Sequence, residues 1–245
     1  GNISGTRASS STTGIIIAGT TTSSPTDGIL MKTDLSGNLS WTKTYGGSGD
    51  ETFNMVIQTS DGGYIAAGYT NSSGAGGRDA LIVKTDANGT VTWAKTYGTV
   101  DDERAYDIVQ TTDGGYAFTG DAKKSGSITT LGAIYLVKLT STGTETWSQM
   151  WGAGSGNYGT NVFQTSDGGY LVGGRSSNGF FAFIKTDGSG TLTFARGSKH
   201  IGLQSVDFSQ MIKTSDGGYA VLGSGDNSSN DHMFAFEKLD AGCVV

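Results

Sequence analysis

The sequence predicts an all-β fold, a five-bladed β-propeller of four-stranded antiparallel blades, from three observations. The chain has 245 residues, of which 41 are glycine and only one is proline, so it is rich in turns without being collagen-like. A motif of the form Thr-Ser/Thr-Asp-Gly-Gly-Tyr recurs at intervals of about fifty residues. No stretch keeps the 3.6-residue apolar periodicity of a helix over three turns. Short strands repeated at this period are typical of propeller blades.

The repeat is clearest at its tyrosine. In an eroded first copy, Ser11–Gly19, Ile15 replaces this tyrosine; the intact copies are Gln58–Tyr64, Gln110–Tyr116, Gln164–Tyr170 and Lys213–Tyr219. A second shared segment follows each copy and ends in an aromatic residue: Trp41, Trp93, Trp147 or Phe194. Five repeats therefore fill the chain, with blades at approximately 1–46, 47–98, 99–152, 153–197 and 198–245.

Turn chemistry divides each repeat into four strands. In the third repeat the strands begin near Ala105, Tyr116, Ala133 and Gly143. The turns between strands one and two, and three and four, carry Asp and Gly, because Asp caps its own backbone and Gly adopts positive φ. Strands such as 80–83 are apolar on both faces, so each repeat must stack on its neighbours. Radial stacking suits such units better than a linear solenoid.

Two arrangements are open for the N-terminal segment. Gly1–Ser4 matches Gly37–Ser40, the start of the first repeat's fourth strand, so residues 1–5 could close the last blade as its outer strand. Alternatively, residues 2–9 form a worn first strand of the first blade.

The string TYGGSGDETFNMVIQTSDGGYIAAGYTNSSG, from Thr44 to Gly74, resembles the bacterial and archaeal extracellular β-propeller repeats of the SBBP type. The resemblance recurs across nearly the whole chain and weakens in the first and last repeats. It implies the propeller fold and a bacterial or archaeal exported protein, located extracellularly, at the cell surface or in the periplasm. It implies little about activity, because such repeats occur in large surface and secreted proteins of mostly unassigned function.

Charge and composition exclude several classes of partner. The formal charge is −6, from 16 Lys and Arg against 22 Asp and Glu, and no basic run offsets it, so nucleic acid is an unfavourable ligand. No apolar run approaches the roughly 18 residues of a membrane-spanning helix, so direct membrane insertion is not expected. Cys243 is the only cysteine, which rules out an intrachain disulfide and a thiolate metal cluster.

The connectors between blades carry the most charged candidate residues. In an up-and-down blade the short hairpins lie on one face, whereas the loops between strands two and three lie with the connectors on the other. The candidates at the predicted channel mouth are Asp50, Glu51, Asp101, Asp102, Glu103, Arg104, Tyr158 and Asp207.

These carboxylates admit three interpretations. They are solvated turn residues, or oxygen ligands for calcium, or the paired acids of a glycoside hydrolase. Catalysis is disfavoured because most of them occupy the same position in the repeat, whereas an active site needs unique acids on particular blades.

The loops between strands two and three differ in length and chemistry, so partner recognition is expected there. The candidate binding residues in these loops are Arg78, Lys123, Lys124 and Phe180. Asp226 and Asp231 border an Asx-rich loop that is a weak calcium candidate. The tryptophans could stack on sugars, but their regular place in the fourth strand favours packing between blades.

Taken together, the sequence predicts a non-catalytic binding or interaction module of a longer exported protein with further domains. Its ligand is a protein or a glycan, bound through the face that carries the variable loops. No cofactor is required, and calcium is the cation that the candidate carboxylates could bind. A glycoside hydrolase that uses the channel-mouth carboxylates is the alternative. A protein scaffold would instead expose apolar loop residues such as Phe180 and Phe181.

Overall fold

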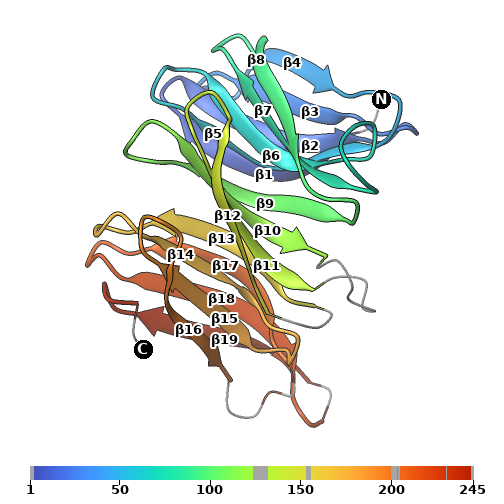
Figure 1. The fold of residues 1–245 in the computed structure, drawn as a ribbon. Coiled ribbons are helices and arrows are strands. Elements are labelled where there is room, and N and C mark those ends of the chain that lie inside the picture. Colours follow the sequence, from blue (N-terminus) through green and yellow to red (C-terminus); the bar gives the residue numbers. More distant parts are fainter. Residues whose placement is uncertain are drawn as a thin grey trace. The chain divides into compact units, whose positions relative to one another are not determined.

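A computed structural model of the chain describes residues 3–123, 132–152, 156–199, 203, 205–229 and 231–243 (Figure 1). Strands and turns make up these ranges, and they contain no helix. In particular, no helix within them is long and apolar enough to cross a membrane.

Nineteen strands follow one another along the described chain. Their bounds are β1 Ile3–Ser11, β2 Gly14–Thr21, β3 Gly28–Thr33, β4 Leu39–Tyr45, β5 Glu51–Gln58, β6 Tyr64–Thr70, β7 Asp79–Thr85, β8 Val91–Tyr97, β9 Glu103–Gln110, β10 Tyr116–Ala122, β11 Ala133–Leu139, β12 Glu145–Trp151, β13 Tyr158–Gln164, β14 Tyr170–Arg175, β15 Phe181–Thr186, β16 Leu192–Ser198, β17 Asp207–Lys213, β18 Tyr219–Asp226 and β19 His232–Leu239.

These strands form five antiparallel sheets in series, which confirms the predicted fold class, a five-bladed β-propeller; each sheet is one blade. The sheets are β1-β2-β3-β4, β5-β6-β7-β8, β12-β11-β10-β9, β13-β14-β15-β16 and β17-β18-β19. The last sheet therefore has three strands within the described residues, whereas four were predicted. Only a turn at Asp240–Cys243 follows β19 there, closed by a hydrogen bond from Cys243 N to Asp240 O (2.9 Å).

The chain divides into two compact units. The first unit contains residues 1–118 and 139–145, and the second contains residues 119–138 and 146–245.

The N-terminal segment belongs to the first blade. β1 pairs antiparallel with β2 from Ile3 opposite Thr21 to Ser11 opposite Gly14. Of the two arrangements considered for this segment, the structure therefore has the one in which it forms the first strand of blade one. Gly1 and Asn2 lie outside the described residues.

The Asp-Gly-Gly hairpins have the turn chemistry that the sequence predicts. Gly62 has a φ of 80°, and the equivalent glycines of three later blades have φ between 79° and 84°. Asp61 Oδ1 accepts hydrogen bonds from Thr59 Oγ1 (2.5 Å) and Gly63 N (3.0 Å). A side chain at Gly62 would be strained by this φ, which is why the repeat keeps glycine at this position.

Each unit is held together by apolar packing between successive sheets. In the first unit, Ile16, Leu30, Phe53 and Val56 are fully buried in one core cluster with side chains from blades one and two. In the second unit, Phe181 and its neighbours form an equivalent cluster with side chains of the last two sheets. This packing holds the connectors and loops in place.

Candidate functional site

Two connector aspartates of the first unit hold the preceding loop. Asp50 Oδ1 accepts hydrogen bonds from the backbone N–H (2.8 Å) and the hydroxyl (3.2 Å) of Thr26. Asp102 Oδ1 accepts from Arg78 N (2.9 Å). The hydrogen bond from Thr26 N, supported by its hydroxyl, lowers the pKa of Asp50. Both aspartates therefore cap the loop that leads into the third strand of the preceding blade.

The glutamates that follow these aspartates are buried. Glu51 is 3% exposed and Glu103 is fully buried. Glu51 accepts from Gly47 N (2.8 Å) and from the Thr70 hydroxyl. Glu103 accepts from Thr99 N (2.8 Å) and Thr99 Oγ1 (2.9 Å). Burial raises the pKa of Glu103 in spite of the Thr99 hydrogen bonds, and the negative charges of Asp79 and Asp101 add to the rise.

Each glutamate faces an aspartate across a glycine. A Cβ added at Gly98 would lie 2.4 Å from Asp79 Oδ1 and 2.5 Å from Glu103 Oε2. At the equivalent Gly46, an added Cβ would lie 1.8 Å from Asp27 Oδ1 and 2.9 Å from Glu51 Oε2. The carboxylate pair therefore occurs twice in the first unit, at the same repeat position.

Arginine and tyrosine side chains gather on the same end of the first unit. The guanidinium carbons of Arg78 and Arg104 lie 5.4 and 5.8 Å from the centroid of the Tyr69 ring. Arg78 Nη1 is also 4.0 Å from Asp102 Oδ2. The structure thus brings together the candidates Arg78, from a variable loop, and Arg104, from a connector.

The second unit has different groups at these positions. Asn157 occupies the position of Glu51 and Glu103, and it donates to Gly132 O (2.9 Å) and accepts from Ser177 N (2.8 Å). Asp207 is exposed and pairs with Arg175 Nε at 3.1 Å. β13 and β14 place Tyr158 opposite Arg175, and burial raises the pKa of Tyr158. In the repeat, Asp207 occupies the same position as Tyr158 and Arg104, which is one residue after the position of Glu51 and Glu103.

The remaining loop candidates lie apart from these clusters. The Lys199 ammonium lies 5.5 Å from the centroid of the Phe180 ring, which is half-buried. Phe181 is fully buried in β15, and this burial contradicts the exposed apolar patch expected of Phe180 and Phe181 in a scaffold. Lys123 is half-buried, and Lys124 lies outside the described residues.

The Asx-rich loop is held by its own hydrogen bonds. Asn227 Oδ1 accepts from Asp231 N (2.9 Å), and Asp226 Oδ1 lies 2.9 Å from His232 Nδ1. Within the parts of the chain that the structure describes, no group of three or more His, Cys, Asp or Glu side chains could hold a metal ion. Asn230 lies outside these parts.

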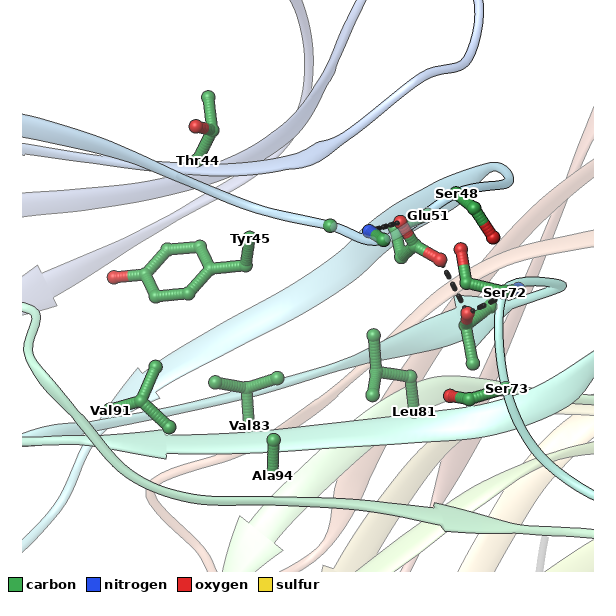
Figure 2. Close-up of a pocket in the computed structure, with 13 residues that line it drawn as sticks. Thr44, Tyr45, Ser48, Glu51, Ser72, Ser73, Leu81, Val83, Val91 and Ala94 are labelled. Atoms are coloured by element: carbon green, nitrogen blue, oxygen red, sulfur yellow. Dashed lines mark hydrogen bonds between the residues drawn. The ribbon is translucent and has the colours of Figure 1, made fainter.

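A pocket of about 470 Å³ opens between blades one and two, inside the first unit (Figure 2). One end is apolar, with Tyr45 above Val83, Val91 and Ala94. The other end is polar, with Glu51 and three serines. The hydroxyls of Ser48 and Ser73 make no hydrogen bond to any described residue, whereas the Tyr45 hydroxyl donates to Gly89 O (2.8 Å). The pocket therefore combines an aromatic wall with unused hydroxyl groups.

A second pocket, of about 350 Å³, lies between blades three and four in the second unit. The repeat relates its lining to that of the first pocket. The matching pairs are Tyr45 and Trp151, Gly46 and Gly152, Glu51 and Asn157, Thr70 and Ser176, Leu81 and Ala182, Val83 and Ile184, and Ala94 and Ala195. The same interblade position is thus hollow in both units, with an aromatic residue on its wall in each.

The regularly spaced tryptophans pack inside the fold. Trp41, Trp93 and Trp147 each lie within 5.5–6.1 Å, centroid to centroid, of the repeat tyrosine of the next blade. A Cβ added at Gly89 would lie 2.9 Å from the Trp41 ring, so the next blade covers that ring closely. These side chains are structural, as their spacing favoured.

Sequence reasoning missed both pockets, because pockets form only when neighbouring blades meet. One signal was available: Trp151 replaces the tyrosine of the Thr-Tyr-Gly segment that lines the first pocket. Tyr45 and Trp151 occupy the same repeat position, and the change of aromatic residue there indicates a surface that differs from one blade to another.

Comparison with known proteins supports the fold. No protein-family model and no curated protein matches the chain. Among solved structures, a protein of unknown function from Bacteroides caccae has a TM-score of 0.60 at 12% identity, over 99% of this chain and 80% of that one. A GH43 β-1,3-galactosidase has a TM-score of 0.53 at 12% identity, over 95% of this chain and 55% of that one. A glucose dehydrogenase has a TM-score of 0.52 at 12% identity, over 90% and 77%. At such identities these likenesses show that the chain shares its fold with proteins of different activities, and they show the fold alone.

Proposed function

We propose that the chain is a non-catalytic carbohydrate-binding module that holds sugars in the pockets between consecutive blades. The observation that carries this proposal is the recurrence of one pocket at equivalent positions in both units, with Tyr45 on the wall of the first and Trp151 on the wall of the second. Repeated sites on a repeated scaffold suit a ligand that is itself repetitive, as a glycan is.

The chemistry of the first pocket fits a sugar ring. The C–H face of a pyranose is apolar and packs against aromatic and aliphatic side chains, while its hydroxyls need polar partners. Tyr45, Val83 and Val91 supply the apolar wall, and Ser48 and Ser73 supply hydroxyls that have no other partner in the described chain. The volume of about 470 Å³ lies in the usual range for small-ligand pockets.

The buried glutamates fit a structural role in this proposal. Each oxygen of Glu51 already accepts a hydrogen bond, from Thr70 or from Gly47. The pair of Asp27 and Glu51 is repeated as Asp79 and Glu103. These carboxylates order the connectors between blades, and the connector held by Glu51 borders the first pocket.

The setting follows from the likeness to SBBP-type repeats. We propose that the module works outside the cytoplasm, at the cell surface or in the periplasm, as part of a longer bacterial or archaeal protein. The variable loops, with the Arg78, Arg104 and Tyr69 cluster, would then be available to protein partners.

A glycoside hydrolase remains the alternative. It would use one carboxylate pair, such as Asp27 with Glu51, as its two acids, and a GH43 β-1,3-galactosidase shares the fold. Hydrolysis of β-1,3-galactan that is lost in Glu51→Gln or Glu103→Gln would establish this alternative.

The proposal is tested by blocking each pocket from an exposed position. Ala94→Arg and Ala195→Arg place a long side chain at the mouth of the first and second pocket, respectively, and both alanines are exposed in their strands. Thr92→Arg, on β8 outside the pocket, is the control. Titration with galactose and β-1,3-galactobiose by calorimetry should show two sites in the wild type, one in each blocked variant and two in the control. Equal binding by all four proteins, or no binding of any sugar in a broader panel, contradicts the proposal.

A further inference from the structure

The two pockets differ in the charge of their linings. Among the described residues that line the first pocket, Glu51 is the only charged one. Among the described residues that line the second pocket, the only charged one is Arg196, and Asn157 stands at the repeat position of Glu51. The same interblade hollow therefore has a negative lining in the first unit and a positive lining in the second.

The hydrogen bonds of Glu51 are those of an ionised carboxylate. Ser72 N donates to Thr70 Oγ1 (2.9 Å), so the Thr70 hydroxyl is left to donate its own hydrogen to Glu51 Oε1. Gly47 N donates to the other oxygen, Oε2 (2.8 Å). Both oxygens therefore act as acceptors, and each has a second lone pair that can accept from a ligand.

The negative charge at this end of the first pocket has no positive partner in the described chain. Asp27 lies across Gly46 from Glu51, and neither carboxylate forms an ion pair with a described lysine, arginine or histidine. Because Glu51 is buried, water and salt screen its charge less than that of a surface carboxylate. A positively charged group on a ligand in the pocket would therefore be attracted to this end.

We propose that the first pocket selects sugars that carry an ammonium group, namely 2-amino-2-deoxyhexoses, and that the second pocket does not, an inference that rests on the sugar binding proposed above. The sugar ring packs against Tyr45 and the aliphatic wall, and its ammonium group lies towards Glu51 at the polar end (Figure 2). The second pocket has no carboxylate among its described lining residues, so it gives an ammonium group no such partner.

The rest of the lining favours an amino sugar over the lysine side chain of a basic peptide. Ser48 and Ser73 offer hydroxyls that make no hydrogen bond within the described chain, and the hydroxyls of a sugar ring can bond to them. A lysine side chain brings an ammonium group and an alkyl stem, so it would leave both serines unused. An amino sugar uses the apolar wall, the hydroxyls and the carboxylate together.

Calorimetric titrations with galactose, galactosamine and galacturonate test the selection by charge. In Ala195→Arg, which leaves only the first pocket open, galactosamine should bind at least about threefold more tightly than galactose, and galacturonate should bind more weakly than galactose. In Ala94→Arg, which leaves only the second pocket open, the preference for galactosamine should be absent. Thr92→Arg adds the same charge outside the pocket and should keep the preference. Raising the ionic strength should reduce it in Ala195→Arg.

Glu51→Gln in the Ala195→Arg background removes the charge at nearly constant shape, so the ratio of galactosamine to galactose affinity should fall to about one. The salt series needs no change at Glu51, so it decides the matter even where this variant folds poorly.

Sugar binding without a preference for galactosamine in Ala195→Arg, or with the same preference in Ala94→Arg, would overturn the selection by charge while sugar binding stood. Lysine amide that binds Ala195→Arg as tightly as galactosamine does would also overturn it, because the pocket would then recognise a cation without a sugar ring. Absence of binding of all three sugars would contradict the proposed function itself, and this inference with it.

Discussion

Asparagine substitutions in the Asp-Gly-Gly hairpins should cost stability in proportion to the burial of the lysine that each aspartate meets. Three hairpins provide the series. Lys84 Nζ lies 2.8 Å from Asp61 Oδ2, Lys185 Nζ lies 2.7 Å from Asp167 Oδ2, and Lys238 Nζ lies 2.9 Å from Asp216 Oδ2. The aspartates are equally exposed, at 62–64%, whereas the lysines range from 5% to 41%.

The magnitude follows from what each substitution leaves behind. Asparagine keeps an oxygen that can accept the glycine N–H, so the loss is mainly the negative charge beside the lysine. For Lys238 the pair is exposed and is worth less than about 1 kcal/mol. For Lys185 the ammonium stays buried without its counter-charge, which costs about 2 kcal/mol, below the value for a fully buried pair because Asp167 is solvated.

Asp167→Asn and Asp216→Asn are the best comparison, because both hairpins lie in the second unit. Calorimetric melts at pH 7 should show a drop of about 4–8 °C for Asp167→Asn and under about 4 °C for Asp216→Asn. In a double-mutant cycle, Lys185→Met should remove most of the cost of Asp167→Asn. Equal costs in the two hairpins, or no coupling in the cycle, would refute the dependence on lysine burial.

Three further outcomes are expected. Burial opposes the ionisation of Asp61, but hydrogen bonds from Lys84, Thr59 and Gly63 outweigh it and lower its pKa to about 2. The stabilisation from this carboxylate is therefore present above pH 3.8 and is lost as the pH falls towards 2, so the melting temperatures of wild type and Asp61→Asn should converge near pH 2. Burial raises the pKa of Glu103, so the stability linked to its neutral form is fully present below the usual glutamate value of 4.5 and is lost as the pH rises. Glu103→Gln should abolish this loss of melting temperature with rising pH, and a loss of unchanged size in the variant would contradict the prediction. Trp147→Ala should cost about 3 kcal/mol in denaturant unfolding because it empties the contact with Tyr170, whereas a loss below about 1 kcal/mol would mean that the ring is not packed.

The fold could be predicted because the same local signals recur along the chain, with the Asp-Gly-Gly-Tyr turn present in four of the five repeats. Asp61 and Gly62 specify a hairpin, Ala80–Val83 specifies a strand covered on both faces, and the Gln58–Tyr64 motif sets the blade length. The structure adds why the motif ends in tyrosine, since Tyr64, Tyr116 and Tyr170 receive the tryptophans of the preceding blade.

The candidate site could be predicted only in part. The sequence marks the connector carboxylates, but it does not tell that Glu51 and Glu103 turn inward while Asp50 and Asp102 cap a loop, because these roles depend on the preceding blade. The pockets depend on the gap between two sheets and on small residues such as Ala94 and Ala195, which carry no chemical signature of their own.

The measurement that tests sugar binding between the blades most directly uses the four tryptophans as reporters. Trp151 lines the second pocket, whereas Trp41, Trp93 and Trp147 pack against repeat tyrosines. In a titration of the indole-¹⁵N-labelled chain with galactose and β-1,3-galactobiose, the Trp151 indole N–H resonance should shift in a saturable way, and the other three should stay nearly fixed. The shift should vanish in Ala195→Arg and persist in Ala94→Arg. Saturable sugar binding that leaves Trp151 unmoved, or that shifts it equally in Ala195→Arg, would contradict a sugar site between the blades.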